Sequence, residues 1–253
     1  MSAITNLCLA IILIHSTTAY KIEKLVYNGD GFRPDVHNYL VMLLVSSNDP
    51  PETLLCSGSI IDKEWILTAA HCFPDNVEQI KIFQQCGSNN CELGSTTGYA
   101  THPKFIHHPH FNYNSAAYDL ALVKTAEPIE FNAYTQLIGL TRLGAFGQQG
   151  IIAGYGDSEF GMGMPFEGTV AVNQCMVAPQ DTGLLCSHSL AYTEIGDSGG
   201  PLTTGDGLVG VISGSVTWST GRESIYVDIS FHFDWIEKVT GKKLHNIVNF
   251  GSC

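Results

Sequence analysis

The segment EIGDSGGP (residues 194–201) sets a serine, Ser198, between an aspartate and two glycines. Such a run is either a surface turn or a sharp bend that presents a nucleophile, because glycine tolerates backbone angles that other residues avoid. A serine acts as a nucleophile when a neutral imidazole lies within hydrogen-bond reach and a buried carboxylate holds that imidazole in the right tautomer. The segment alone does not decide, so both groups have to come from elsewhere in the chain.

Two other segments supply these groups. ILTAAHC (66–72) carries His71 at the end of an apolar run, and YDLALVK (118–124) carries Asp119 directly before one. Each residue taken singly is weak evidence, since a histidine after a strand is more often structural and an aspartate before a strand is often a turn residue. Three coincidences in the order His, Asp, Ser favour a catalytic triad of His71, Asp119 and Ser198.

Short apolar runs recur along the chain between Gly, Pro, Asn and Asp, as expected of strands. The runs are YLVMLLV (39–45), WILTAA (65–70), LALVK (120–124), GIIAGYG (150–156), GLVGVISG (207–214) and SIYVDI (224–229). Only residues 229–243 show helical spacing, with Gly241 as the stop signal. The pattern predicts an all-β fold with a terminal helix, and a weak boundary at 125–136 divides it into two β subdomains.

The composition bounds the class of protein and its partners. The 253 residues are 44% hydrophobic, which is enough for a sizeable core, and only 14% are charged, with a formal net charge of -12. No basic stripe is present to follow a phosphate backbone, so we expect no nucleic-acid partner.

The N-terminal residues have the composition of a secretory signal. An apolar stretch at 7–14 precedes small and hydroxyl residues up to Ala19. This stretch is too short to span a bilayer, since a membrane-spanning helix needs about 20 apolar residues. We therefore expect a signal peptide at 1–19, secretion to the extracellular space and no membrane partner. Loss of Cys8 with the signal leaves seven of the eight cysteines, in keeping with an oxidising compartment. No CxxC spacing occurs, so we expect no zinc site. We also expect no other metal and no cofactor.

Longer motifs surround the three triad residues. They are CSGSIIDKEWILTAAHC (56–72), YDLALVK (118–124), AGYG (153–156), GDSGGPL (196–202), LVGVIS (208–213), and IYVDI followed by DWI (234–236). On these motifs the chain resembles the chymotrypsin-like, or trypsin-like, serine proteases over nearly all of its mature length. The resemblance implies two antiparallel six-stranded β-barrels with a C-terminal α-helix. It implies a protease domain at 25–253, with the first barrel at about 25–130, the second at about 131–230 and the helix at about 231–241.

The resemblance also implies a role for each site residue. Ser198 attacks the scissile carbonyl, His71 takes its proton and passes it to the leaving amine, and Asp119 orients the imidazole. The backbone N–H groups of Gly196 and Ser198 form the oxyanion hole. Ser213 matches the family serine that hydrogen-bonds the triad aspartate.

A further implication is activation by cleavage. In the family, a new N-terminal ammonium pairs with the aspartate at the position of Asp197 and organises the oxyanion loop. Cleavage after Lys24 suits a trypsin-like activator, whereas ungapped counting favours cleavage after Leu25, so the end of a short propeptide at 20–24 stays open by one residue.

Disulfide pairing follows the same resemblance. It implies one bridge between Cys56 and Cys72, which closes the loop that carries His71, and a second between Cys175 and Cys186. A third bridge between Cys86 and Cys91 is suggested by proximity alone and stays open, because connectivity is not readable from spacing. The fate of Cys253 is also open.

The primary specificity pocket departs from the family pattern. Glu194 stands where the family has a cysteine, and the partner cysteine is missing from residues 214–224. Tyr192 falls at the pocket floor, with Ser215 and Ser224 on the walls. Without an acidic floor residue, a preference for Lys or Arg is disfavoured. We expect a shallow or polar pocket for small or uncharged side chains, unless Tyr192 swings away.

The histidines His107, His108 and His110 lie close together in the sequence and suggest a metal site. The family has a His-Pro-x-aromatic-Asn surface loop at this place, so a loop without metal is the better interpretation.

The sequence thus favours a secreted serine endopeptidase, made as a zymogen, that acts as a monomer on protein or peptide substrates. Its other expected partners are an activating protease and protein inhibitors. One alternative is a catalytically inactive homologue that binds extracellular partners, and the intact triad argues against it. Another is an esterase with a nucleophile elbow, which the all-β pattern and the residue order disfavour.

Overall fold

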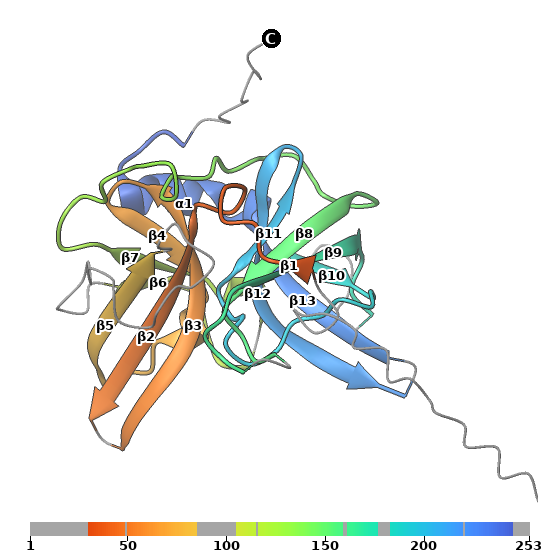
Figure 1. Ribbon diagram of the computed structural model, residues 1–253, viewed down its shortest axis with the longest axis horizontal. Coiled ribbons are helices and arrows are strands. Elements are labelled where there is room, and N and C mark those ends of the chain that lie inside the picture. Colours follow the sequence, from red (N-terminus) through yellow and green to blue (C-terminus); the bar gives the residue numbers. More distant parts are fainter. Residues whose placement is uncertain are drawn as a thin grey trace, which may run out of the picture.

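The computed structural model describes residues 30–48, 50–84, 105–114, 116–158, 161–176, 183–219 and 221–244 (Figure 1). The expected signal peptide at 1–19, the propeptide at 20–24, the bridge between Cys86 and Cys91, and Cys253 lie outside these residues. No helix in the described ranges is long and apolar enough to cross a membrane.

The first sheet is antiparallel and has six strands in the order β5-β2-β3-β4-β7-β6. Their bounds are β2 Leu40–Asn48, β3 Pro51–Asp62, β4 Trp65–Thr68, β5 Val77–Gln84, β6 Phe105–His107 and β7 Ala121–Lys124. β4 lies between β3 and β7 and is buried along its whole length, with Trp65, Ile66 and Leu67 packed in the hydrophobic core. His71 and Asp119 flank β4 and β7, which are neighbours in this sheet, so the two residues come from the same part of it.

The second sheet closes on itself. Its strands follow the order β9-β10-β13-β12-β11-β8, and β8 also pairs with β9, which makes a six-stranded barrel. The bounds are β8 Gln149–Gly154, β9 Phe166–Asn173, β10 Leu184–Ser187, β11 Pro201–Thr204, β12 Gly207–Trp218 and β13 Gly221–Asp228. A two-residue strand, β1 (Asp30–Gly31), pairs with Phe166 and Glu167 at the start of β9, so the N-terminal end of the described chain lies on the second sheet.

Helical structure is confined to short elements. Three 3₁₀ turns occur among the described residues: η1 Ala70–Cys72, η2 Ala116–Tyr118 and η3 Ile229–Phe231. The α-helix α1 (Phe233–Thr240) ends at Gly241, whose left-handed backbone closes the last turn by donating its N–H to the carbonyl of Glu237. The predicted all-β fold with two antiparallel six-stranded sheets and a C-terminal helix is therefore confirmed. The second sheet is a closed barrel, whereas the first is a half-barrel, because its outer strands β5 and β6 do not pair among the described residues.

The two sheets lie side by side in Figure 1, with the first in orange and yellow and the second in green and blue. Each has its own buried aliphatic core, centred on residues such as Leu43 and Ile66 in the first and Val172 and Leu202 in the second. The loop between β10 and β11, which contains Ser198, reaches the first sheet, where the Ser57 N–H donates to the Ser198 carbonyl at 2.8 Å. This contact brings the three triad candidates to the junction of the sheets.

Candidate active site

His71 lies in the turn η1, directly after the buried strand β4. The neighbouring Cys72 is bonded to Cys56 of β3, so a covalent link fixes this turn to the adjacent strand. The loop closed by the bridge has a sequence separation of 16 residues. A loop of that size stabilises the fold by about 3 kcal/mol in the chain-entropy model. A second bridge joins Cys175 to Cys186.

Asp119 is the buried partner of this histidine, with 3% of its surface exposed. Its Oδ2 accepts a hydrogen bond from the His71 ring Nδ1 at 2.7 Å and from the Ser213 hydroxyl at 2.6 Å. Its Oδ1 accepts from the His71 backbone N–H at 2.8 Å. A proton on Nδ1 leaves the lone pair on Nε2, which is the tautomer that a general base requires.

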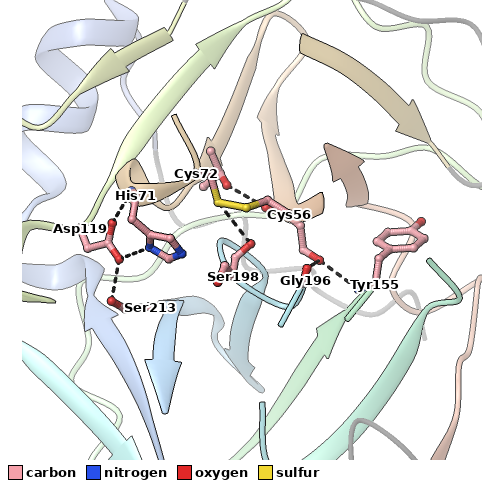
Figure 2. Close-up of a disulfide and its surroundings, with 10 residues drawn as sticks. Cys56, His71, Cys72, Asp119, Tyr155, Gly196, Ser198 and Ser213 are labelled. Atoms are coloured by element: carbon pink, nitrogen blue, oxygen red, sulfur yellow. Dashed lines mark hydrogen bonds and ion pairs between the residues drawn. A yellow bond between two sulfur atoms is a disulfide. The ribbon is translucent and has the colours of Figure 1, made fainter. Parts of the chain in front are cut away.

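Ser198 lies on the other side of the His71 ring, as Figure 2 shows. It is half-buried, and its hydroxyl forms no hydrogen bond with any described residue. A cleft of about 310 Å³ opens next to His71, Asp119 and Ser213, and aromatic side chains, Phe111 and Tyr113, form its other wall. Two of the three triad candidates, His71 and Asp119, thus line this accessible space.

The backbone around Ser198 is bent as the glycine pattern suggests. Gly196 has a φ of 98°, in the left-handed region, and a Cβ there would lie 2.8 Å from Leu55 Cδ2 and 2.9 Å from Gly156 Cα. Only glycine fits such a position. The N–H groups of Gly196 and Ser198 donate to no acceptor within the described ranges, so both are available to a ligand oxygen.

Ser57 is a residue of this site that sequence reasoning missed. It is fully buried, its hydroxyl donates to the Gly196 carbonyl at 2.9 Å, and the Tyr155 N–H donates to the same hydroxyl at 2.9 Å. Figure 2 draws these bonds at Gly196 and Tyr155. Ser57 therefore ties the loop of Ser198 to strand β3 and to the end of β8. It lies in the quoted CSGSII motif, but nothing in that motif indicates that its hydroxyl forms hydrogen bonds with distant backbone groups.

Asp197 points away from the cleft into the protein. Its carboxylate accepts from the Gly156 N–H at 2.8 Å and from the Glu194 N–H at 2.9 Å, and 2% of the residue is exposed. No cationic side chain in the described part of the chain forms an ion pair with it. Burial is the main cause that raises the pKa of Asp197 from 3.8 to about 7, since a buried carboxylate without a countercharge is unfavourable.

The predicted pocket residues lie near one another. Ser215 and Ser224 are cross-strand partners in β12 and β13, and the buried Ser224 hydroxyl accepts from the Thr193 N–H at 3.1 Å. Tyr192 precedes Thr193 and is half-buried. The Arg222 guanidinium lies over the Tyr192 ring, 4.6 Å from its centroid.

Of the three neighbouring histidines, His108 is buried, His107 is half-buried and His110 is exposed. His108 is 7% exposed, is stacked on Tyr118, and has its Nε2 3.4 Å from Nδ1 of the equally buried His232. Burial, with smaller contributions from the neighbouring histidines, lowers the pKa of His108 to about 4. His107 packs edge-on against Phe111. In the ranges that the structure describes, no group of three or more His, Cys, Asp or Glu side chains is arranged to hold a metal ion.

Comparisons of the sequence and of the fold with known proteins identify relatives of this chain. The sequence model of the trypsin family matches residues 26–236. Trypsin of Sus scrofa is 26% identical over 208 residues, which cover 72% of this chain and 84% of that protein. Trypsin V-B of Rattus norvegicus is 24% identical over 258 residues, with 92% and 98% of the two chains covered.

A solved structure titled HL collagenase has a similar fold. It superimposes with a TM-score of 0.71 at 24% identity and covers 85% of this chain and 99% of its own. The family match spans most of the chain and includes the segments that carry His71, Asp119 and Ser198. The chain therefore belongs to the trypsin family of serine proteases.

Proposed function

We propose that the chain is a serine endopeptidase that hydrolyses peptide bonds through an acyl-enzyme intermediate. The observation that carries the proposal is the placement of the His71 ring, which donates from Nδ1 to the buried Asp119 carboxylate and faces Ser198 on its other side (Figure 2). An imidazole held in this way has the tautomer and the orientation of a general base.

In the proposed reaction, Ser198 Oγ bonds to the scissile carbonyl carbon while its proton passes to His71 Nε2. Asp119 stays ionised and stabilises the imidazolium, and the oxyanion accepts hydrogen bonds from the N–H groups of Gly196 and Ser198. The C–N bond then breaks, and the amine leaves with the proton from His71. A water molecule hydrolyses the ester by the same route and restores the Ser198 hydroxyl.

The chain is further proposed to be a zymogen. The support comes from Asp197, whose buried carboxylate lacks a cationic partner within the described ranges. Cleavage after Lys24 or Leu25 would create an ammonium group that could neutralise it. An ion pair there would fix the turn that carries the Gly196 and Ser198 amides.

The proposed specificity is for small or uncharged side chains rather than Lys or Arg. Tyr192 supplies no carboxylate to a basic substrate side chain, and the guanidinium of Arg222 lies over its ring. The carboxylate of the neighbouring Glu194 is already paired with Arg222, so a substrate cation entering here would find no free countercharge to offset its loss of solvation.

Secretion and the domain limits belong to the same proposal: a signal peptide at 1–19, a propeptide at 20–24 and a protease domain at 25–253. The bonded pairs Cys56–Cys72 and Cys175–Cys186 support an oxidising compartment. N-terminal sequencing of protein recovered from the culture medium, before and after activation, tests both cleavage sites. Recovery only in the cell fraction would contradict secretion.

Labelling with a fluorophosphonate probe after controlled activation tests the enzyme proposal. We expect activated protein to take up one label and Ser198→Ala to take up none. If a control protease reacts and the activated chain does not, the chain is the inactive homologue. A peptide library then tests the pocket, and dominant cleavage after Lys or Arg would contradict the proposed specificity.

A further inference from the structure

Arg222 connects two segments that border the proposed specificity pocket. It lies at the start of β13 and forms an ion pair with Glu194, which precedes the oxyanion turn. Its guanidinium is 4.6 Å from the centroid of the Tyr192 ring, and its Nε donates to the Thr217 hydroxyl of β12 at 3.3 Å. We call Arg222, Glu194 and Tyr192 together the Arg222 strap.

The strap joins the turn that carries the proposed oxyanion donors. The backbone of Glu194 exchanges two hydrogen bonds with Asp197: its N–H donates to the Asp197 carboxylate at 2.9 Å, and its carbonyl accepts from the Asp197 N–H at 3.1 Å. Residues 194–197 are therefore one closed turn. A force on the Glu194 side chain acts on the peptide groups of Gly196 and Ser198, which lie in or directly after this turn.

No covalent bond performs this task among the described residues, because the disulfides there join Cys56 to Cys72 and Cys175 to Cys186. Thr193 adds hydrogen bonds at this place. Its backbone N–H and its hydroxyl donate to the Ser224 hydroxyl of β13 at 3.1 Å and 3.3 Å, and its hydroxyl donates to the Gly214 carbonyl of β12 at 3.4 Å. Arg222 is thus the charged residue that connects β13 to this turn.

We propose that Arg222 is a positioning residue, whose ion pair with Glu194 holds the oxyanion turn at the geometry that the proposed peptidase reaction requires. The inference rests on that proposed function. Since the Gly196 and Ser198 amides act mainly on the transition state, loss of the strap lowers kcat and leaves KM almost unchanged. The side chains of Arg222 and Glu194 are 28% and 24% exposed, so salt weakens the pair as well.

The size of the fall in kcat distinguishes a positioning residue from an ordinary exposed ion pair and from an oxyanion donor. Loss of an ordinary exposed ion pair changes an equilibrium by up to about fivefold. Deletion of one oxyanion donor lowers turnover about 100-fold to 1000-fold. Arg222→Gln keeps both oxyanion donors and removes one ion pair that holds their turn. We therefore expect a fall in kcat between these two limits, about tenfold to 30-fold.

The kinetic test uses the activated full-length chain and an uncharged peptide substrate. Arg222→Gln is compared with the exchange Glu194→Arg plus Arg222→Glu, which restores an ion pair with reversed polarity and should recover at least half of the lost kcat. Raising the salt from 0.1 to about 1 M should lower kcat in the wild type and not in Arg222→Gln, since the screening length falls from about 10 Å to about 3 Å.

Arg142→Gln is a matched control. Arg142 also forms an ion pair, with Asp234 at 3.0 Å, and also covers an aromatic ring, with its guanidinium 3.9 Å from the centroid of Phe233. These contacts lie at α1, which supplies no residue to the proposed triad, oxyanion hole or pocket. We expect unchanged kcat, KM and salt dependence for this variant.

A second measurement does not depend on activity. Hydrogen–deuterium exchange of peptides covering residues 194–198 should be faster in Arg222→Gln than in the wild type, with no change in Arg142→Gln. Unchanged exchange and unchanged kcat would overturn the positioning role while the proposed peptidase stands, provided that the wild type accepts the fluorophosphonate label. If the wild type accepts no label, the proposed function fails, and the exchange data still decide whether Arg222 holds the turn.

Discussion

His71 donates to both carboxylate oxygens of Asp119, from its backbone N–H to Oδ1 at 2.8 Å and from its ring Nδ1 to Oδ2 at 2.7 Å. The two bonds fix the main chain and the ring of the histidine against one buried group. The Ser213 hydroxyl adds a third bond to Oδ2, at 2.6 Å. This arrangement leaves one ring nitrogen free and defines the direction in which it points.

Asp119→Asn should therefore abolish most activity without unfolding the protein. An amide nitrogen facing Nδ1 would move the imidazole proton to Nε2, and a ring in that tautomer cannot accept the proton of Ser198. We expect the rate of fluorophosphonate labelling to fall about 10⁴-fold. Ser213→Ala removes only one of the three bonds and should lower the rate about tenfold. Equal losses in the two variants would contradict the tautomer argument.

Ser57→Ala should lower both stability and activity. It leaves the Gly196 carbonyl and the Tyr155 N–H without their buried partner, and each unsatisfied group costs about 1–3 kcal/mol. We expect the free energy of unfolding to fall by about 2–4 kcal/mol in urea titrations, with a lower kcat. The control is Ser46→Ala, because Ser46 forms an exposed hydrogen bond with Thr53 on the same sheet. A similar loss in both variants would show that burial of the Ser57 hydroxyl carries no special weight.

Of the glycine-to-alanine substitutions at the site, Gly199→Ala should lower the stability of the protein most. Gly199 has a φ of 82°, and a Cβ there would lie 2.0 Å from Thr68 Oγ1 and 2.4 Å from the Ser57 carbonyl. Both neighbours are fully buried, so we expect a loss of more than about 4 kcal/mol or failure to fold. Gly205→Ala, where nothing lies within 4 Å, should stay within about 1 kcal/mol. Thermal unfolding of both purified variants decides the matter, and a stable Gly199→Ala protein would refute the packing argument.

The uncleaved chain should lose stability as the pH rises, owing to Asp197. Its pKa in the folded state, about 7, lies above the value of 3.8 for an unburied carboxyl. Folding therefore favours the protonated form, so this contribution is fully present below pH 3.8 and is lost as the pH rises through about 7. We expect a loss of up to about 4 kcal/mol relative to Asp197→Asn across this window.

Activation should reverse this dependence. An ammonium group beside Asp197 would favour the carboxylate and lower its pKa, so the activated chain should keep its stability up to neutral pH. Melting temperatures of both forms from pH 4 to pH 8, each referred to Asp197→Asn, provide the measurement. Parallel profiles for uncleaved and cleaved protein would show that the new N-terminus does not reach Asp197.

The sequence by itself predicted six of the thirteen described strands (β2, β4, β7, β8, β12 and β13), the terminal helix and the three triad candidates. These strands were predictable because each holds a short apolar run bounded by turn residues, and α1 because its apolar spacing ends at a glycine. His71, Asp119 and Ser198 were recognisable because each stands in a contiguous sequence motif. Such a motif can be read without knowing which distant residues it contacts in the folded protein.

Only the tertiary structure decided which distant groups support these residues. Ser57 meets Tyr155 and Gly196 across sequence separations of 98 and 139 residues, and Arg222 meets Glu194 across 28. A hydrogen bond requires its two atoms to lie about 3 Å apart in the right direction, and that condition depends on how distant segments pack in the folded chain. The packing of the second barrel against β3 assigns the partners of Ser57. The position of the loop between β10 and β11 beside β13, within the second barrel, assigns the partners of Arg222.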